Sequence, residues 1–290
     1  MGYLHIDNLY KNQTILAEKE CYALEKIHGT SAHVAFDGTS LRFFSGGEKH
    51  EAFVSLFDES VLIEKFLSLS GDFPGTLTVY GEAYGGKQQG MRETYGPTLK
   101  FVAFEVKQAD KWLPVPVAAA ICSCLGIEFV YYEKIPTDLR VIDAHRDMDS
   151  TQAIRNGIGP GKMREGVVLK PIEEKVDHRG NRVIAKHKRD EFRETKSPRV
   201  VTEVPTEIID AQKAADEWVT EMRLTHVLDK IPGHSIQQMT TIIAAMVEDV
   251  LREGAGEVVD TPALRKALSR KTAVTYKAYL QNNLLRVALP

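Results

Sequence analysis

A lysine beside a glycine-containing turn offers a reactive side chain near the start of the sequence. Residues 25–30 read Glu-Lys-Ile-His-Gly-Thr, with Lys26 two positions before His28. A deprotonated lysine amine can attack the α-phosphate of a nucleoside triphosphate, and because a free lysine has a pKa of ~10.4, the surroundings must help to remove its proton. Gly29 would let the backbone approach a bound nucleotide closely. Alone, the motif does not distinguish this chemistry from a surface lysine before a turn.

Two further motifs place a carboxylate beside glycine or an aromatic ring. Residues 79–86 read Val-Tyr-Gly-Glu-Ala-Tyr-Gly-Gly, and Glu82 at the end of the expected strand could bind a ribose hydroxyl. Residues 101–106 read Phe-Val-Ala-Phe-Glu-Val, so Phe104 could stack on a base while Glu105 adds a polar contact. The structural alternatives are a strand-to-turn junction and a core strand with one carboxylate at its edge.

Two later motifs suit a metal ion and phosphates. Glu165 opens the run Glu-Gly-Val-Val-Leu-Lys-Pro and could hold magnesium through the ion's water ligands. Lys186 and Lys188 lie two residues apart, so in a strand both side chains point to one face. A pair of ammonium groups suits a triphosphate and would lower the pKa of a neighbouring lysine. The alternative is an edge strand protected by lysines.

The elements around these motifs are mostly strands up to about residue 204. Residues 31–36 and 41–44 form an expected hairpin around the Asp-Gly turn at 37–38. Asp58 is expected to cap a helix, and Gly126 to end another that covers residues 115–125. The remaining expected strands cover these ranges: 76–82, 101–106, 166–170 and 182–188.

From about residue 205 the pattern becomes helical. Apolar residues recur at helical spacing after a cap at Ser235, and Pro262 suits the first turn of another helix. We therefore expect an α+β fold. Residues 1–204 would form a domain of antiparallel sheets flanked by helices, and residues 205–290 a small helical domain.

Composition narrows the class of protein. The 290 residues are 43% hydrophobic and 27% charged, as in a globular protein of one or two domains. No apolar run approaches the ~20 residues of a membrane span, and no secretory signal is visible, so we expect a cytoplasmic protein without a membrane partner. The three cysteines, Cys21, Cys122 and Cys124, fit neither a zinc site nor a disulfide framework. We expect Cys122 and Cys124 to fill the core.

Charge is unevenly distributed although the net charge is only −3. Residues 162–199 contain 12 Lys or Arg against 7 Asp or Glu, and residues 261–290 contain six basic residues and no acidic one. Such segments could form a phosphate-binding face, or they could simply be solvated surface.

The order of the motifs carries more information than any one of them. It resembles that of the covalent nucleotidyltransferase superfamily of DNA ligases, RNA ligases and mRNA capping enzymes, across about 165 residues. The closest resemblance is to the RNA ligase 2 family, because His28 stands where DNA ligases and capping enzymes usually carry aspartate. Helices, not an OB-type barrel, are also expected after the catalytic domain. Ser31 and Glu105 depart from the family pattern, which has asparagine and aspartate there.

The resemblance implies that residues 1–204 form an adenylyltransferase (ATP-grasp-like ligase) domain, and it implies a role for each motif residue. Lys26 would carry the AMP adduct, Glu165 would help to place magnesium, and the other residues would contact ATP. Within that group Glu82 would bind the ribose, Phe104 would stack on adenine, and the lysine pair would hold the α-phosphate and the departing pyrophosphate. The implied nucleotide contacts are Glu25, Ile27, His28, Arg42, Glu82, Phe104, Lys186 and Lys188.

The resemblance also implies a reaction and its partners. We expect an ATP-dependent RNA ligase that joins 3′-hydroxyl and 5′-phosphate ends through lysyl-AMP, with Mg²⁺ as its metal. The partner would be a nucleic acid, RNA in particular, with a nicked duplex as one candidate, and the enzyme would act as a monomer. The alternatives are a guanylyltransferase that uses GTP and a non-catalytic nucleic-acid-binding protein on a ligase fold.

Overall fold

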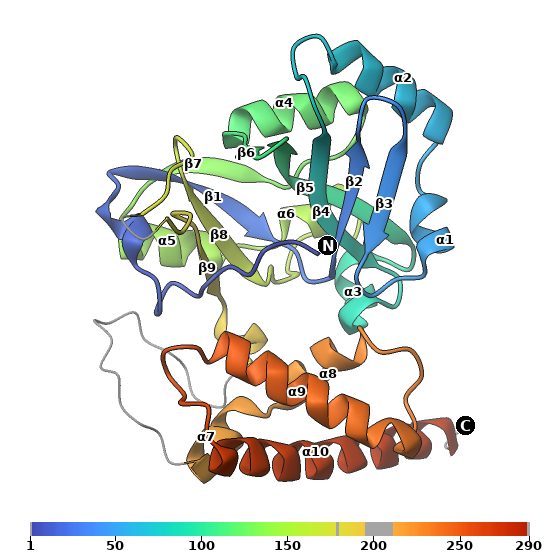
Figure 1. Ribbon diagram of the computed structural model, residues 1–290, viewed down its shortest axis with the longest axis vertical. Coiled ribbons are helices and arrows are strands. Elements are labelled where there is room, and N and C mark those ends of the chain that lie inside the picture. The colour runs from blue at the N-terminus through green and yellow to red at the C-terminus, as the bar shows by residue number, and fades with distance from the viewer. Residues whose placement is uncertain (1, 178–179, 195–210, 289–290) are drawn as a thin grey trace. The chain divides into compact units, whose positions relative to one another are not determined.

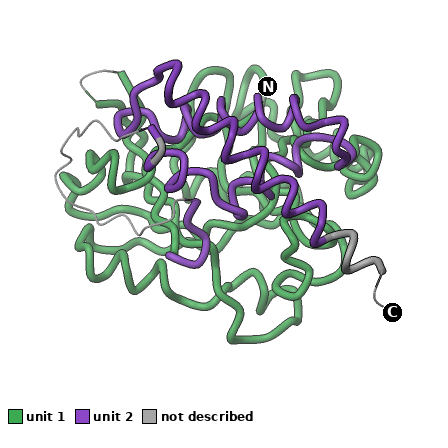
Figure 2. Tube along the Cα trace, turned by 90° about the horizontal axis from the view of Figure 1, so that it is seen from below, with its two compact units in different colours: residues 1–189 green, residues 190–290 purple. Residues whose placement is uncertain are grey.

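The computed structural model describes residues 2–177, 180–194 and 211–288. It divides into two compact units, Met1–Arg189 and Asp190–Pro290 (Figure 2). The domain boundary expected near residue 205 lies outside the described residues and stays a prediction. No helix in the described part of the chain is both long and apolar enough to cross a membrane.

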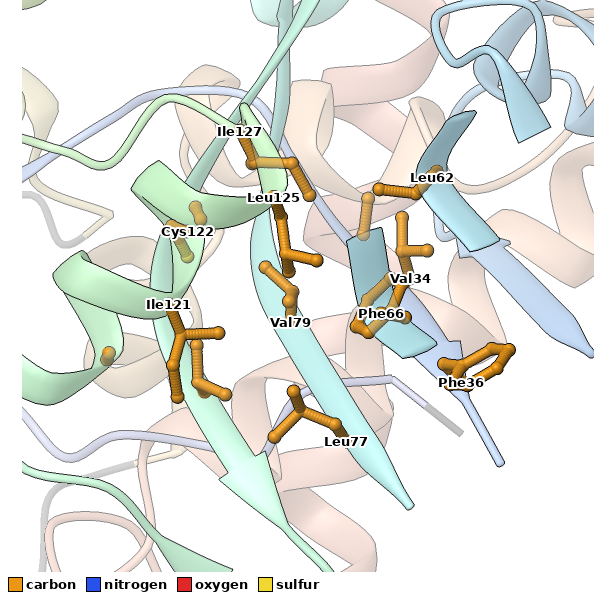
Figure 3. Packing of buried hydrophobic residues seen from close by; sticks show 14 of the residues in the cluster. Val34, Phe36, Leu62, Phe66, Leu77, Val79, Ile121, Cys122, Leu125 and Ile127 are labelled. Atoms are coloured by element: carbon orange, nitrogen blue, oxygen red, sulfur yellow. The ribbon is translucent and has the colours of Figure 1, made fainter. Parts of the chain in front are cut away.

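The larger sheet of the first unit has five antiparallel strands in the order β3-β2-β4-β5-β6 (Figure 1). The hairpin of β2 and β3 forms as expected around the Asp-Gly turn. Apolar residues on one face of the sheet, among them Val34 and Val79, pack against Phe66 and Ile121 from α2 and α4 (Figure 3). The strands are β2 (Thr30–Phe36), β3 (Leu41–Ser45), β4 (Leu77–Gly85), β5 (Leu99–Gln108) and β6 (Lys111–Trp112).

On this sheet, helix α2 begins and helix α4 ends where the sequence predicts. Asp58 caps α2 (Glu59–Leu69) by accepting a hydrogen bond from the Val61 amide, and Gly126 ends α4 (Val115–Leu125) in the left-handed conformation. Cys122 is buried, as expected, but Cys124 is exposed, so its expected place in the core was wrong. Two residues along a helix turn a side chain by about 200°, onto the opposite face. The short elements nearby are α1 (His50–Val54), η2 (Gln88–Gly90) and α3 (Arg92–Tyr95).

A second antiparallel sheet has the strand order β7-β1-β8-β9. The expected strand at 182–188 is shorter and begins at Ala185. The helices α5 and α6 follow β7 in the chain. The elements are η1 (Thr14–Ala17), β1 (Glu20–Lys26), β7 (Tyr132–Pro136), α5 (Leu139–Arg146), α6 (Thr151–Arg155), β8 (Gly166–Pro171) and β9 (Ala185–Lys188).

The described part of the second unit is helical, as predicted. Its core contains Trp218, Leu224, Met246 and Leu268. Ser235 makes a capping box with Gln238, but it caps the short η4 that leads into α9. The elements are η3 (Asp190–Phe192), α7 (Ala211–Trp218), α8 (Glu221–Leu228), η4 (Ile236–Gln238), α9 (Met239–Glu253) and α10 (Pro262–Ala288).

Candidate active site

The pairing of three strands brings the ends of three separate motifs to one level of the smaller sheet. Lys26, the last residue of β1, lies opposite Gly166, the first residue of β8. Gly166 in turn lies opposite Lys188, the last residue of β9. Because antiparallel partners face each other directly, residues 140 or more positions apart in the sequence meet there.

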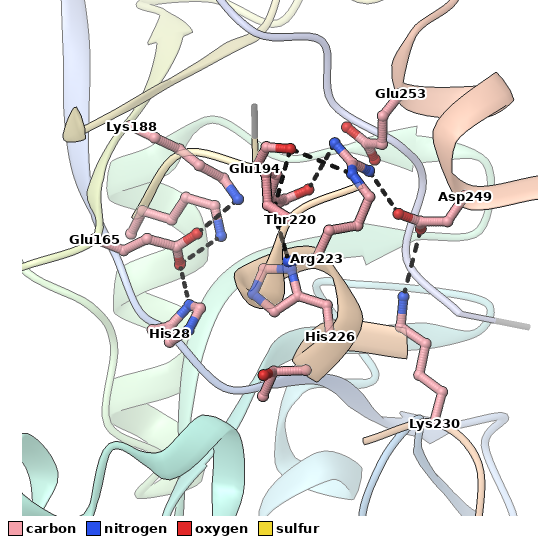
Figure 4. Close-up of polar contacts among 12 residues, drawn as sticks. His28, Glu165, Lys188, Glu194, Thr220, Arg223, His226, Lys230, Asp249 and Glu253 are labelled. Carbon is pink, nitrogen blue, oxygen red and sulfur yellow. Dashed lines mark hydrogen bonds and ion pairs between the residues drawn. The ribbon is translucent and has the colours of Figure 1, made fainter. Parts of the chain in front are cut away.

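Glu165 is the centre of this meeting point (Figure 4). Its carboxylate lies 2.9 Å from the Lys26 amine, 2.9 Å from the Lys188 amine and 3.2 Å from Nδ1 of His28. The side chain is only 1% exposed. Burial alone would raise the pKa of this carboxyl, but Lys188, Lys26 and His28 outweigh burial and hold the pKa well below its usual value. Glu165 is therefore an anion that three nitrogen groups surround.

The turn after Lys26 is held tightly against β4. A Cβ atom on Gly29 would lie 2.4 Å from the Ala83 carbonyl oxygen, so a side chain does not fit there. The amide of the buried His28 donates a hydrogen bond to the Tyr95 hydroxyl at 3.3 Å. These contacts explain why Lys-x-His-Gly works as a unit: glycine allows the close approach, and histidine is then placed beside Glu165.

Glu82 comes to the same place from β4. It is partly buried, and burial raises the pKa of its carboxyl to about 7, with Lys26 opposing the shift and Glu165 adding to it. The Gly29 amide also donates a hydrogen bond to this carboxylate. The structure thus brings together Lys26, His28, Glu82, Glu165 and Lys188, which the sequence predicts as parts of one site.

Phe104 occupies an irregular point of β5. The register between β4 and β5 shifts there, because Tyr80 faces Glu105 while Gly81 faces Ala103. A bulge of this kind redirects a side chain. The ring is partly exposed, packs on the cluster that contains Ile27, and contacts the Tyr3 ring edge-on at 4.9 Å between centroids.

The carboxylate of Glu105 is engaged elsewhere. It accepts hydrogen bonds from Tyr3, Lys170 and Arg182. Burial would raise its pKa, but Lys170 and Arg182 together keep it below the usual value. The polar contact to a base that the sequence suggests for Glu105 is therefore replaced by an internal ion-pair cluster.

The lysine pair lies on one face of β9, as the alternation predicts. Lys186 faces Val168 across the sheet and Lys188 faces Gly166. Lys186 is 9% exposed. Its backbone bonds to Asp7 and Leu9, so the N-terminal segment runs alongside β9 at this point.

Three residues expected at the nucleotide are placed differently from the others. Ile27 is buried in a hydrophobic cluster. The Glu25 carboxylate binds the Ser150 hydroxyl at 2.6 Å, on the side of β1 away from Lys26. Arg42 is 63% exposed and lies 3.7 Å from Asp37 at the turn end of the hairpin. Ala35, which lies opposite Arg42 on β2, is five residues from Thr30 at the site, a distance of about 17 Å along the strand.

The sequence did not predict the buried residues that hold Glu25 and His28 in place. Ser150, Tyr95 and Arg164 are buried and bond to Glu25, His28 and the α5–α6 connection. Arg164 directly precedes Glu165 and so belongs to a recognised motif, but its position in the sequence does not show which residues it contacts. Ser150 and Tyr95 carry no signal in a single sequence because their partners are more than 60 residues away.

The chain is similar to one protein family and to a group of solved structures. The family model described as RNA ligase matches residues 19–188. The chain resembles solved structures of RNA ligase from Naegleria gruberi: one of a variant with ATP and Mn (16% identity, TM-score 0.51) and one with PPi (15% identity, TM-score 0.51). Each match covers 66% of this chain and 57% of the other. A search of curated proteins found no match.

The fold, two antiparallel sheets flanked by helices, is shared with these RNA ligase structures. The match extends over more than half of the sequence and includes every motif residue named above, from Glu25 to Lys188. The chain belongs to the RNA ligase family.

Proposed function

We propose that this protein is an ATP-dependent RNA ligase that works through a lysyl-AMP intermediate on Lys26. The observation that carries the proposal is the contact of the Lys26 amine with Glu165, at 2.9 Å, beside Lys188. A lysine that served only as a surface charge would not need a buried carboxylate and a second lysine from two distant parts of the chain. The ATP and Mn in the Naegleria structures support a nucleotide and a divalent metal as ligands of this fold.

The first step would form the adduct. The Lys26 nitrogen attacks the α-phosphorus of ATP, an N–P bond forms, the bond to the β-phosphate oxygen breaks, and pyrophosphate leaves while the amine gives a proton to solvent. Lys188 and Lys186 would face the developing negative charge. Glu165 orients both Lys26 and Lys188, so the attacking group and a charge-stabilising group are positioned by one side chain.

The next two steps would transfer the nucleotide and seal the ends. A 5′-phosphate oxygen of the RNA attacks the adduct's phosphorus, the N–P bond breaks, and the end becomes adenylylated. The 3′-hydroxyl then attacks the 5′-phosphate, a phosphodiester forms, and AMP leaves. Lys26 is the nucleophile in the first step and the leaving group in the second, but it forms no bond in the third.

The described residues supply only some of the ligands that a magnesium ion needs. No cluster of three or more His, Cys, Asp or Glu able to hold a metal exists among the described residues. Magnesium commonly binds one or two carboxylates together with substrate phosphates and water. Glu165, which lies close enough to Glu82 to raise the pKa of that carboxyl, would be the protein's ligand to the ion. When bound, the ion would neutralise phosphate charge.

The direct test is incubation of the protein with magnesium and α-labelled ATP or GTP. The proposal predicts covalent label from ATP. Label from GTP alone would indicate a guanylyltransferase, and no label from either would indicate a binding protein. A panel of nicked and single-stranded substrates with 5′-phosphate and 3′-hydroxyl ends would then show which nucleic acid is joined, with 5′-hydroxyl versions of the same strands as controls.

A further inference from the structure

The residues directly before Lys26 and Glu165 both hold one segment, residues 145–152. Glu25 accepts hydrogen bonds from the Ser150 hydroxyl at 2.6 Å and from the Gln152 amide at 3.2 Å. Arg164, two residues before β8, binds the same segment. Its guanidinium donates to the Asp149 carbonyl at 3.0 and 3.2 Å, to the His145 carbonyl at 3.2 Å and to the Thr151 hydroxyl at 3.2 Å.

These contacts are buried and mutually dependent. Glu25, Ser150 and Arg164 are 2%, 0% and 1% exposed. Burial raises the pKa of Glu25, although the Ser150 bond and Arg164 oppose the shift. Burial likewise lowers the pKa of Arg164, and Glu25 opposes that shift. Two charges held out of water need well-placed partners, so the positions of these side chains are narrowly defined.

Ser150 also links β1 to the helix α6. While its hydroxyl donates to Glu25, its oxygen accepts a hydrogen bond from the Ala153 amide at 3.0 Å and so caps α6. The Gln152 amide in the first turn of α6 points at the same carboxylate. The segment is therefore a folded, internally bonded element and can serve as a fixed reference for both strands.

Neighbouring residues of a strand point to opposite sides. At β1, Glu25 binds the segment while Lys26 projects toward Glu165. Directly before β8, Arg164 binds the segment while Glu165 contacts Lys26. Lys26 and Glu165 therefore each follow a buried residue, Glu25 or Arg164, and both of these buried residues bind residues 145–152.

We propose that residues 145–152, here called the clamp segment, set the placement of the Lys26 amine relative to Glu165 through Glu25, Ser150 and Arg164. These three are positioning residues for adduct formation. The inference rests on the proposed function of Lys26. Its observable consequence is that a change in the clamp slows the attack on bound ATP without changing how tightly ATP binds.

The test is single-turnover adduct formation by the full-length protein at increasing concentrations of α-labelled ATP with magnesium. Ser150→Ala and Arg164→Lys should lower the rate constant at saturating ATP by about tenfold or more, since small misplacements can cost up to ~10² in rate. The half-saturating ATP concentration and the final labelled fraction should stay at wild-type values. Asp58→Ala, which removes the cap of α2 away from the site, is the matched control and should leave the rate constant unchanged.

Two further comparisons separate positioning from folding. Glu25→Gln keeps one acceptor for Ser150, so it should be slowed less than Glu25→Ala. The double variant Glu25→Ala/Ser150→Ala should be slowed by less than the product of the two single effects, because both changes remove the same Glu25–Ser150 bond. If a buried variant fails to fold, Thr151→Val removes one partner of Arg164 and should still be slowed.

The outcomes are distinct. If the role is purely structural, less protein folds, so the labelled fraction falls while the rate constant of the folded enzyme stays unchanged. That result would overturn the proposal. Wild-type rate constants in every clamp variant would do the same. Failure of the proposed function would show itself differently, as absence of label from the wild-type protein.

Discussion

The amine of Lys26 and the carboxylate of Glu165 lie 2.9 Å apart although 139 positions separate them in the sequence. The same carboxylate lies 2.9 Å from Lys188 and 3.2 Å from His28. The expected nucleophile and the expected metal-placing residue are therefore direct partners. A metal ion at Glu165 would compete with Lys26 for this carboxylate. Binding of the metal would therefore free the Lys26 amine from its contact with Glu165.

The lysine pair of β9 should contribute to adduct formation. Lys188→Ala removes an ammonium group beside Glu165, and Lys186→Ala removes one from the same face of the strand. We expect each to lower the rate of adduct formation by ~10²–10³, as for other charge-stabilising groups. The measurement is covalent labelling by ATP, with Lys111→Ala, an exposed lysine of β6, as the control. Wild-type labelling by both variants would mean that the two lysines only protect the edge of the sheet and take no part in the reaction.

Phe104 should take part in ATP binding. Stacking on a base is worth ~1–3 kcal/mol, so Phe104→Ala should weaken ATP binding by about 5- to 150-fold. Equilibrium binding of ATP measures this change, and the thermal unfolding midpoint shows whether the variant folds. An unchanged affinity in a folded variant would leave Phe104 as a packing partner of Tyr3.

Glu82 should make stability depend on pH. Its pKa is raised from 4.5 to about 7 by burial, so between these values the folded protein holds a proton that the unfolded chain has released. The stabilisation from this group is thus full below pH 4.5 and is lost as pH rises toward 7. Glu82→Gln should lack this loss. Denaturant unfolding of both proteins from pH 5 to 8 tests the difference, and identical pH dependence would contradict it.

The basic residues of α10 should bind the nucleic acid by charge. Arg265 is paired with Asp260 and Glu248, and Lys271 with Asp216, so two of the residues in the acid-free segment are occupied. Exposed positions on this helix are Lys266, Arg270 and Lys277. Each phosphate contact contributes a salt slope of ~0.7–0.9.

Reversing these three charges to glutamate should therefore weaken binding of a nicked 5′-phosphate RNA and flatten its salt dependence by about 2–3 in slope. Adduct formation should be unaffected, and Lys111→Glu serves as the control. An unchanged slope would mean that the three residues are solvated surface.

Local signals predicted much of the fold. Asp58, the Asp-Gly turn and Gly126 act through their own backbone neighbourhoods, so caps and turns could be placed from sequence. The Lys26, Glu82, Glu165 and Lys188 motifs could be joined because their order resembles a family. Arg42 could not be placed, since its distance from the site depends on hairpin register, and Glu105 could not, since its partners come from three other segments of the chain. The anchors Glu25, Ser150 and Arg164 depend on tertiary contacts alone.

The most direct test is to locate the label. The protein is incubated with magnesium and α-labelled ATP, digested under conditions that keep the phosphoramidate intact, and the labelled peptide is identified beside Lys26→Ala treated in the same way. We predict label on the peptide that contains Lys26, none on the variant, and retained sealing by the variant of RNA supplied with an already adenylylated 5′ end. Undiminished covalent labelling of Lys26→Ala, or label on a different lysine of the wild-type protein, would contradict the account.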